Sequence, residues 1–401
     1  MAPGHRVVDR RRRLSEPGVP VLCQGDRLRW SSLLWMSATL VGSAACGPST
    51  ATATATAPAA DGAPALRHRV DLARGPLTYA VDFVDERQLV SIELGERFEL
   101  VVRDVAVAHR PRETLRVPLG GSTHDVEDLA VARLRRQVWV SSRAGHVRGF
   151  DLQSGALVAT WHLGSPATAV AISPDERWVA MGTSDGLVCL RRYRDGALVQ
   201  CTLAHDGQIS DLAFSVRGER LSTSSWNGEV TDWQIPSLAV AARRRFAGAA
   251  CALAWSADGR LAIARSAFPP VRSPEVVARE RREPGGAPDE HHAVTIAHAD
   301  GTVRHLRGHR GPVIDVAWAG GAQVLSASWD GTVRLWEVAR ARELASYRGF
   351  TFLVRSVAFA GERLVAVGAW TRGRDGRATT LLERRAHHRG RQGGASVRSQ
   401  E

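Results

Sequence analysis

Short runs in which apolar and polar residues alternate fill most of the chain after residue 66. Residues 323–328 (QVLSAS) and 332–338 (TVRLWEV) have a period of two, which is the pattern of half-buried β-strands. The turn between them, 329–331 (WDG), contains the Asp-Gly pair typical of tight hairpins. The pattern predicts a protein built from short strands and Gly-containing turns.

The same arrangement recurs along the chain. A four-residue apolar core occurs seven times, and successive copies lie 48, 41, 42, 41, 63 and 41 residues apart, where 63 is 41 plus an insertion of 22. Each copy contains an apolar run, a turn, an alternating strand, a Gly-containing turn and two further strands. A period of this length with four strands per unit indicates a repeat architecture. The copies end at Phe83, Val131, Ile172, Phe214, Trp255, Trp318 and Phe359.

The repeat resembles the WD40 family of β-propellers. Gly308-His309 precedes one unit, and the third strand of that unit ends in LWEV, where the family has Trp-Asp; Ala204-His205 and DWQI occupy the same places in another unit. The resemblance implies an all-β fold over residues 66–383, a seven-bladed propeller with four-stranded antiparallel blades. Residues 66–72 are then the strand that completes the last blade, which removes an exposed sheet edge.

In this family a His, a Ser, a turn Asp and a Trp form a buried hydrogen-bonded network within a blade. Asn227 replaces the turn Asp in blade four, and Arg191 stands where blade three should have Trp. The resemblance gives the two histidines a structural role, so we do not expect them to be ligands or catalysts. The matching residues are His309, Ser326 or Ser328, Asp330 and Trp336 in blade six, and His205, Ser222 or Ser224 and Trp233 in blade four.

Two features are candidates for partner binding. The insertion at residues 267–291 is rich in Pro, Gly and charge and is expected between the second and third strands of blade five, as a partner-binding lid or as a tolerated loop expansion. Trp226 and Trp329 fall in turns between second and third strands, and Trp370 follows the second strand of blade seven, all on the face that most often binds partners in the family. They are either an exposed aromatic anchor or packing against a neighbouring blade.

Cys189 and Cys201 flank the turn of blade three. With a three-residue loop at 194–196 they face each other and reach disulfide distance, and the bond then forms in an oxidising compartment. A two-residue loop shifts the register by one and separates them. The five cysteines show no metal-binding spacing.

The N-terminus has the layout of a secretory signal: positive charge, an apolar run at 30–45, then small residues. Ser43–Cys46 (SAAC) resembles the cleavage site of bacterial lipoprotein signals, which implies lipid attachment to Cys46, although Ser43 stands where the family usually has Leu. We predict a leader at 1–45, a flexible Thr/Ala/Pro tether at 46–65 and a disordered basic tail at 384–401. The alternative is a mis-assigned start and a cytoplasmic protein.

The net charge of +12 raises the possibility of nucleic-acid binding. All 53 basic residues apart from histidine are Arg, which is typical of a GC-rich genome, and residues 1–60 and 381–401 contribute +4 and +3 of the charge. We therefore do not expect a specific nucleic-acid site.

The sequence contains no catalytic or cofactor-binding signature. We predict a non-enzymatic, monomeric protein-interaction scaffold, without a cofactor and with unidentified protein partners, at the cell envelope. A propeller enzyme with a site in the central funnel is the less favoured reading.

Overall fold

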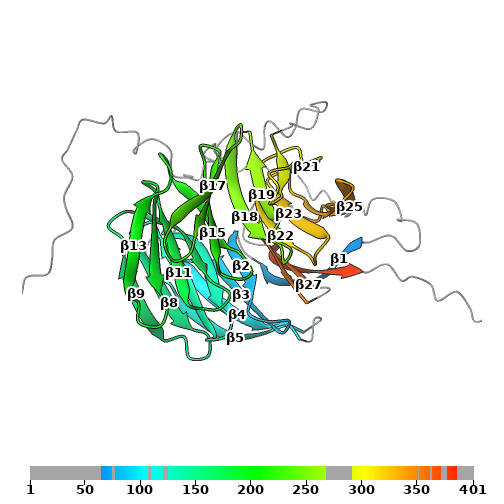
Figure 1. Cartoon of the computed structure of the whole chain (residues 1–401). Coiled ribbons are helices and arrows are strands. Elements are labelled where there is room, and N and C mark those ends of the chain that lie inside the picture. Colours follow the sequence, from blue (N-terminus) through cyan, green and yellow to red (C-terminus); the bar gives the residue numbers. More distant parts are fainter. Residues whose placement is uncertain are drawn as a thin grey trace, which may run out of the picture. The chain divides into compact units, whose positions relative to one another are not determined.

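The computed structural model describes residues 65–74, 77–106, 110–120, 125–267, 291–350, 352–361, 364–371 and 377–385. All of them lie in the second of the two compact units of the chain, 49–401. The leader, Cys46, nearly all of the tether, most of the insertion and nearly all of the tail lie outside these ranges. The described residues form 28 strands and no helix (Figure 1). No helix there is long and apolar enough to cross a membrane.

Five antiparallel sheets have four strands each, and each sheet follows chain order from its inner strand to its outer strand. We name the strands of a sheet a, b, c and d in that order. The sheets are β6 (Val126–Ala132), β7 (Gln137–Ser142), β8 (His146–Asp151), β9 (Leu157–His162); β10 (Ala167–Ile172), β11 (Trp178–Thr183), β12 (Leu187–Arg192), β13 (Leu198–Leu203); β14 (Ile209–Phe214), β15 (Arg220–Ser225), β16 (Glu229–Gln234), β17 (Ala239–Arg245); β18 (Ala249–Trp255), β19 (Leu261–Ser266), β20 (Ala293–Ala297), β21 (Val303–Arg307); and β22 (Val313–Trp318), β23 (Gln323–Ser328), β24 (Val333–Glu337), β25 (Arg342–Tyr347).

The remaining strands form one eight-stranded sheet, not two separate blades as the sequence predicted. The two halves are linked at a single residue pair, Leu77 with Trp370, where β2 begins and β27 ends. The N-terminal strand β1 pairs antiparallel with β28 over its whole length, so it supplies the outer strand of the last unit. The strands are β1 (Ala65–Arg74), β28 (Arg377–Arg385), β27 (Leu364–Trp370), β26 (Leu353–Ala360), β2 (Leu77–Phe83), β3 (Gln88–Leu94), β4 (Phe98–Asp104) and β5 (Arg112–Pro118).

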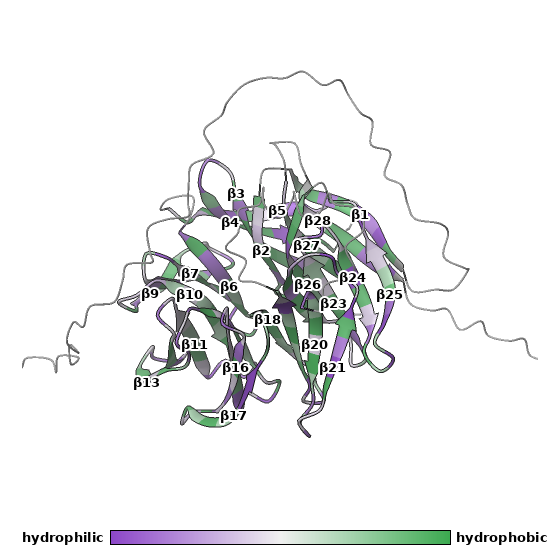
Figure 2. Ribbon diagram, turned by 90° about the horizontal axis from the view of Figure 1, so that it is seen from above, coloured by the Kyte–Doolittle hydropathy of each residue, from purple (hydrophilic) through white to green (hydrophobic). Residues whose placement is uncertain are grey.

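The a strands contact one another in a closed circle, and the d strands lie outside (Figure 2). The order around the circle is β2, β6, β10, β14, β18, β22, β26 and back to β2. Apolar side chains from facing sheets fill the space between neighbours; Val188, Leu190, Leu221 and Trp233, for example, pack in one cluster. This packing of sheets around a central axis is the architecture of a β-propeller.

Every a strand carries a β-bulge at the same position, four residues before the last residue of its apolar core. A bulge re-aims the extra side chain, and here that side chain reaches the next sheet: Thr168 Oγ1 donates to Ile209 O (2.7 Å) and Ser210 Oγ to Ala250 O (2.6 Å). The bulged residues are Tyr79, Glu127, Thr168, Ser210, Cys251, Ile314 and Arg355.

Because the strands alternate in direction, each sheet has two ends. The a–b and c–d connections share one end, which we call the turn face, and the b–c and d–a connections share the other, which we call the loop face. Contacts between neighbouring a–b turns follow the ring: Leu134 N and Arg135 N donate to Glu176, and Arg133 pairs with Asp82. The end of β19 and the start of β20 lie at the loop face, and residues 268–290, the bulk of the insertion between them, lie outside the described residues.

Candidate functional site

In blade six, four buried polar side chains are linked by successive hydrogen bonds. Trp336 Nε1 donates to Ser326 Oγ (2.8 Å), Ser326 Oγ contacts His309 Nε2 (2.7 Å), and His309 Nδ1 contacts Asp330 Oδ2 (2.9 Å). The assignment that satisfies every atom has Ser326 donating to Nε2 and a neutral His309 donating from Nδ1. Ser326, not Ser328, therefore completes the network.

Burial and neighbouring groups determine the ionisation states of His309 and Asp330. Burial lowers the pKa of His309, which keeps the ring neutral near pH 7. Burial alone would raise the pKa of Asp330, but the hydrogen bonds from His309 and Thr332 outweigh it and hold that pKa low. Arg334, whose side chain is also buried, lies 3.6 Å from the same carboxylate. The arrangement ties the loop before β22 to the turn after β23, which is a structural role.

The blade-four network contains the predicted His205 and Trp233, but its hydroxyl group and its acid differ from those predicted. Thr223 Oγ1, not Ser222 or Ser224, contacts His205 Nε2 (2.7 Å) and accepts from Trp233 Nε1 (3.1 Å). Strand geometry explains the correction. Alternate residues of β15 point to opposite faces of the sheet, and Thr223 shares the face of His205 and Trp233. Thr223 lies ten residues before the Trp, as Ser326 does in blade six. The missing Asp is replaced by Glu229, which lies 3.4 Å from His205 Nδ1. Asn227 Nδ2 donates to that same glutamate.

Blade one has an arginine in place of the tryptophan. Arg103 forms a bidentate ion pair with Glu93 and donates to Ser91 Oγ, and all three are buried. Arg103 and Glu93 border a cavity of about 390 Å³ between β1, β28 and strands β2 to β5. The other charged residues of that cavity also pair with one another, Arg116 with Glu99 and with Glu113. The charged groups that line the cavity pair with one another, so they do not indicate which ligand the cavity would bind.

The a strands together form the inner ring of the propeller, and their side chains provide a hydrogen-bond acceptor for one backbone N–H group of each a strand. Apart from the single pair between Leu77 and Trp370, each a strand is an edge strand, so N–H groups on its free edge need another partner. Asp128 Oδ1 accepts from Leu129 N (2.8 Å) and its Oδ2 from Val170 N of the next blade (3.0 Å). Asp211 takes Leu212 N and Leu253 N in the same way, and Asp315 takes Val316 N and Val357 N.

Three aspartates thus satisfy six equivalent N–H groups, two apiece. The seventh, Val81 N, donates to Ser356 Oγ at 3.3 Å. Ser356 in turn hydrogen-bonds to Asp315. The carboxylates therefore alternate around the ring, and a serine occurs where the alternation breaks.

Burial raises the pKa of all three aspartates. The pKa of Asp128 rises to about 7 and that of Asp315 to about 6, with the backbone hydrogen bonds acting in the opposite direction, and that of Asp211 rises well above its usual range. Raised carboxyl pKa values can mark catalytic sites. Here both oxygens of each carboxylate already accept backbone N–H groups, so they bind the blades to one another.

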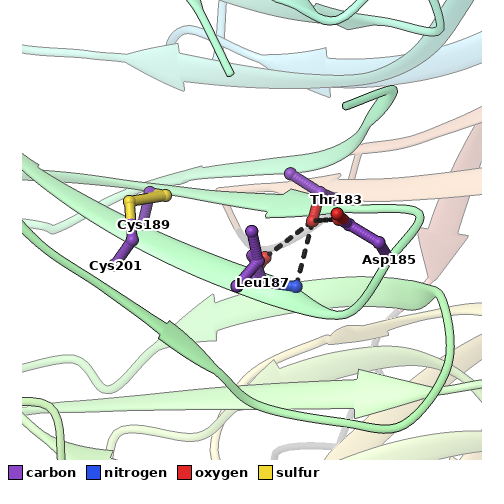
Figure 3. The surroundings of a disulfide bond; sticks show 5 residues. All are labelled: Thr183, Asp185, Leu187, Cys189 and Cys201. Carbon is purple, nitrogen blue, oxygen red and sulfur yellow. Dashed lines mark hydrogen bonds between the residues drawn. A yellow bond between two sulfur atoms is a disulfide. The ribbon is translucent and has the colours of Figure 1, made fainter. Parts of the chain in front are cut away.

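Cys189 and Cys201 form a disulfide between β12 and β13, with an S–S distance of 1.99 Å (Figure 3). The bond lies beside the b–c turn of blade three, where Thr183 Oγ1 accepts from Leu187 N (3.0 Å) and contacts Asp185 Oδ1 (2.5 Å). Cys189 is buried and Cys201 is exposed on the outer strand. The bond joins the outer strand of blade three to the strand inside it.

The register that brings the two cysteines together has a different origin from the one predicted. The turn closes between Arg192 and Ala197, which by itself would place Cys189 opposite Gln200. A bulge at Val199 then shifts the register by one and places Cys189 opposite Cys201. Equivalent bulges occur between strands c and d of the blades that contain Arg103, Phe150, Trp233 and Trp336.

The three turn tryptophans do not form an exposed cluster, which corrects the expectation of an aromatic anchor. Trp329 is only 4% exposed and packs with Phe352 and Leu353 of the next blade. Trp226 and Trp370 are half-buried; Trp370 meets Phe352 edge-on at 6.2 Å. Packing between neighbouring blades, the alternative that the sequence left open, accounts for these positions.

Among the residues that the structure describes, no group of three or more His, Cys, Asp or Glu side chains could hold a metal ion. The polar clusters of the core are the blade networks and the inner ring. Both connect parts of the fold, and neither leaves a nucleophile beside a free base.

Comparisons with known proteins agree with this geometry. The family model of the WD domain, G-beta repeat (WD40), matches residues 155–191, 196–231 and 300–337. The angio-associated migratory cell protein of Canis lupus familiaris is 25% identical over 212 residues, which cover 46% of this chain and 42% of that protein. The chain therefore spans less than half the length of this curated relative.

Among solved structures, that of U3-55K superposes with a TM-score of 0.53 at 19% identity, over 63% of this chain and 76% of that chain. At that identity the likeness concerns the fold alone. Three segments of the chain thus match the WD40 repeat model, and the chain has the β-propeller fold.

Proposed function

We propose that this protein is a seven-bladed, non-enzymatic interaction scaffold held at the cell envelope by a lipid on Cys46. The blade count is supported by the closed circle of a strands from β2 to β26. The hydrogen bonds of the inner ring support the count independently. Each of three aspartates accepts N–H groups from two neighbouring blades, and a serine accepts the remaining one, as an odd number of blades requires. The single ladder pair at Leu77 then joins two blades into one sheet.

The scaffold function rests on the WD40 propeller fold and on the structural use of the buried polar groups. A funnel enzyme needs charged groups that are free to act on a substrate. The carboxylates of the a strands instead hold backbone N–H groups, and His205 and His309 hold their blades together. A monomeric propeller that presents its surface to protein partners fits this arrangement, and no cofactor is part of the proposal.

The observation that carries the envelope location is the Cys189–Cys201 disulfide. Disulfides persist in oxidising compartments outside the cytosol. Export also agrees with the signal-like segment and the Ser43–Cys46 sequence. A cytoplasmic scaffold with a mis-assigned start is the second candidate, and it would keep both thiols reduced.

Cell fractionation tests the location. The full chain and its Cys46→Ser variant are produced in a bacterium that processes lipoproteins, and each fraction is probed for the protein. We expect the parent in the membrane fraction, and a variant that stays an uncleaved precursor or is released by mild washing. A parent found in the cytosol with free Cys189 and Cys201 would establish the cytoplasmic alternative.

A further inference from the structure

Both ends of the propeller chain are at the turn face. The first residue of β1, Ala65, pairs with the last residue of β28, Arg385. Beside this pair, Arg384 Nη1 donates to Ala319 O (2.7 Å) and to Gln323 Oε1 (2.8 Å), which belong to the a–b turn of blade six. A tether that precedes residue 65 and a tail that follows residue 385 therefore both leave the fold at this face.

The turn face also carries nearly all of the exposed large apolar side chains. Nine such side chains are exposed in the described part of the chain, and eight of them lie in a–b turns or in the first two residues of d strands. Val240 and Val303 belong to blades four and five. The other six are in blades two to four: Leu134, Leu157, Val158, Leu198, Val199 and Val216.

The fold itself turns two of these side chains outward. Val158 and Val199 are the bulged residues of β9 and β13, and each follows an exposed leucine, Leu157 and Leu198. An apolar pair therefore projects from the same corner of two neighbouring blades. Scattered single apolar residues on a surface need no explanation, but a set confined to one face marks an interaction surface.

Arginines are interspersed with these aliphatic residues. The a–b and c–d turns of blades two to four contain six arginines and four carboxylates, an excess of two positive charges. Arg177 and Arg194 are 72% and 80% exposed, and their nearest carboxylates are 3.9 and 4.0 Å away. Residues 386–401 add three arginines and one glutamate. Aliphatic and arginine side chains together suit the interface of an anionic bilayer, where burial of the former adds to the attraction of the latter.

The loop face differs. Of the nine exposed large apolar residues only Leu203, at the end of β13, lies toward it. The two strand ends that flank the insertion of blade five, Ser266 and Ala293, lie on that side. The apolar character therefore belongs to one end of the molecule.

We propose that the turn face of blades two to four docks onto an anionic lipid surface, with the loop face directed away from it. This inference rests on the proposed lipid tether. A random-coil tether of the 19 residues from 46 to 64 has a root-mean-square reach of about 25 Å. It attaches at the turn face, so a protein anchored at Cys46 holds that face next to the bilayer. The loop face then remains open to protein partners.

Fluorescence quenching by the bilayer tests the orientation. The mature lipidated protein is labelled at Val216→Cys on the turn face or at Asp206→Cys on the loop face; in the described part of the chain the one free cysteine, Cys251, is buried and will not react. Each is reconstituted in vesicles that contain phosphatidylglycerol and a quencher lipid. We expect strong quenching at position 216 and little at 206.

Two charge variants on one strand give a matched control. Leu198 and Leu203 are at opposite ends of β13 and are 51% and 56% exposed. Leu198→Asp is expected to lower the ratio of docked to free propeller about fivefold, as one charge near an anionic surface does. Leu203→Asp should leave quenching at 216 unchanged.

The outcomes separate this inference from the proposed tether. A lipidated, vesicle-bound protein whose labels are quenched equally, or only at 206, overturns the docking face and leaves the tether in place. Cross-links between copies through position 216 without quenching by lipid would assign this face to self-association and also overturn it. A mature chain without lipid overturns both proposals.

Discussion

Val81 N donates to Ser356 Oγ at 3.3 Å, and this bond joins the first blade to the last. At the equivalent positions of the other a strands the acceptor is an aspartate that serves two N–H groups. An acceptor that serves two a strands at a time cannot close a ring of seven a strands. The serine supplies the remaining acceptor.

Removal of this acceptor should weaken the closure. Ser356→Ala leaves Val81 N without a partner and is expected to lower the free energy of unfolding by about 1–3 kcal/mol. Ser346→Ala, on the outer strand β25, is the matched control and should change it by less than about 0.5 kcal/mol. Urea unfolding followed by tryptophan fluorescence measures both. Equal losses would show that the bond has no special part in closure.

The inner aspartates make stability depend on pH. The pKa of Asp128 is raised to about 7 in the folded protein, so the folded state binds more protons than the unfolded state between the two pKa values. The contribution of Asp128 to the free energy of unfolding is therefore largest at low pH and is lost as the pH rises through about 7. Between pH 6.5 and 8, above the usual pKa of histidine, we expect a loss of about 1 kcal/mol, measured by urea midpoints at each pH.

Asp128→Asn should flatten this slope, although it lowers stability at every pH. Asp151→Asn is the control: hydrogen bonds from Ser154 lower the pKa of that carboxylate, so it is ionised throughout this range. An Asp128→Asn protein with an unchanged slope would mean that its carboxyl does not titrate near pH 7.

The two blade networks should differ in their contribution to stability. His309→Ala removes the acceptor of the Ser326 hydroxyl and one of the donors to Asp330, whose side chain is only 6% exposed, whereas His205→Ala removes a contact of Glu229, whose side chain is 29% exposed to water. We expect losses of about 3 kcal/mol and about 1 kcal/mol. Guanidinium unfolding of the two variants measures the difference. A larger loss for His205→Ala would contradict the account of the blade-six network.

The disulfide should stabilise the propeller by restricting the unfolded chain. Its cysteines are 12 residues apart, and the loss of a cross-link across a loop of that size costs about 3 kcal/mol. Cys201→Ser in the exported protein is expected to show this loss. Alkylation of the unfolded parent without reductant should leave both cysteines unmodified. Their modification would show that the bond is absent in the cell.

The repeat, the strand order and the role of β1 were predictable because each depends on local patterns that recur. The alternation of apolar residues gives strands, and the fixed period gives units that pack on one another. His309 and Trp336 were predictable because blade six keeps the family pattern. The single-pair link at Leu77, which fuses two units into one sheet, depends on where two strand ends meet and has no local signal.

The errors arose where a bulge or a neighbouring blade decides the outcome. Ser222 and Ser224 are one residue away from the position that faces His205, and the choice depends on the register of β15. A bulge at Val199, which no turn signal reveals, pairs Cys189 with Cys201. Trp329 has the sequence of an exposed turn residue, but Phe352 and Leu353 of the next blade cover it. Glu229 replaces the turn Asp from a position two residues further on.

The mass of the mature N-terminus tests the central claim, a WD40 propeller tethered at the envelope, most directly. The protein is produced in a bacterium that processes lipoproteins and is analysed by intact-mass and N-terminal peptide measurement. The account predicts a chain that begins at a diacylated Cys46. A chain that retains residues 1–45 and carries no lipid would contradict it.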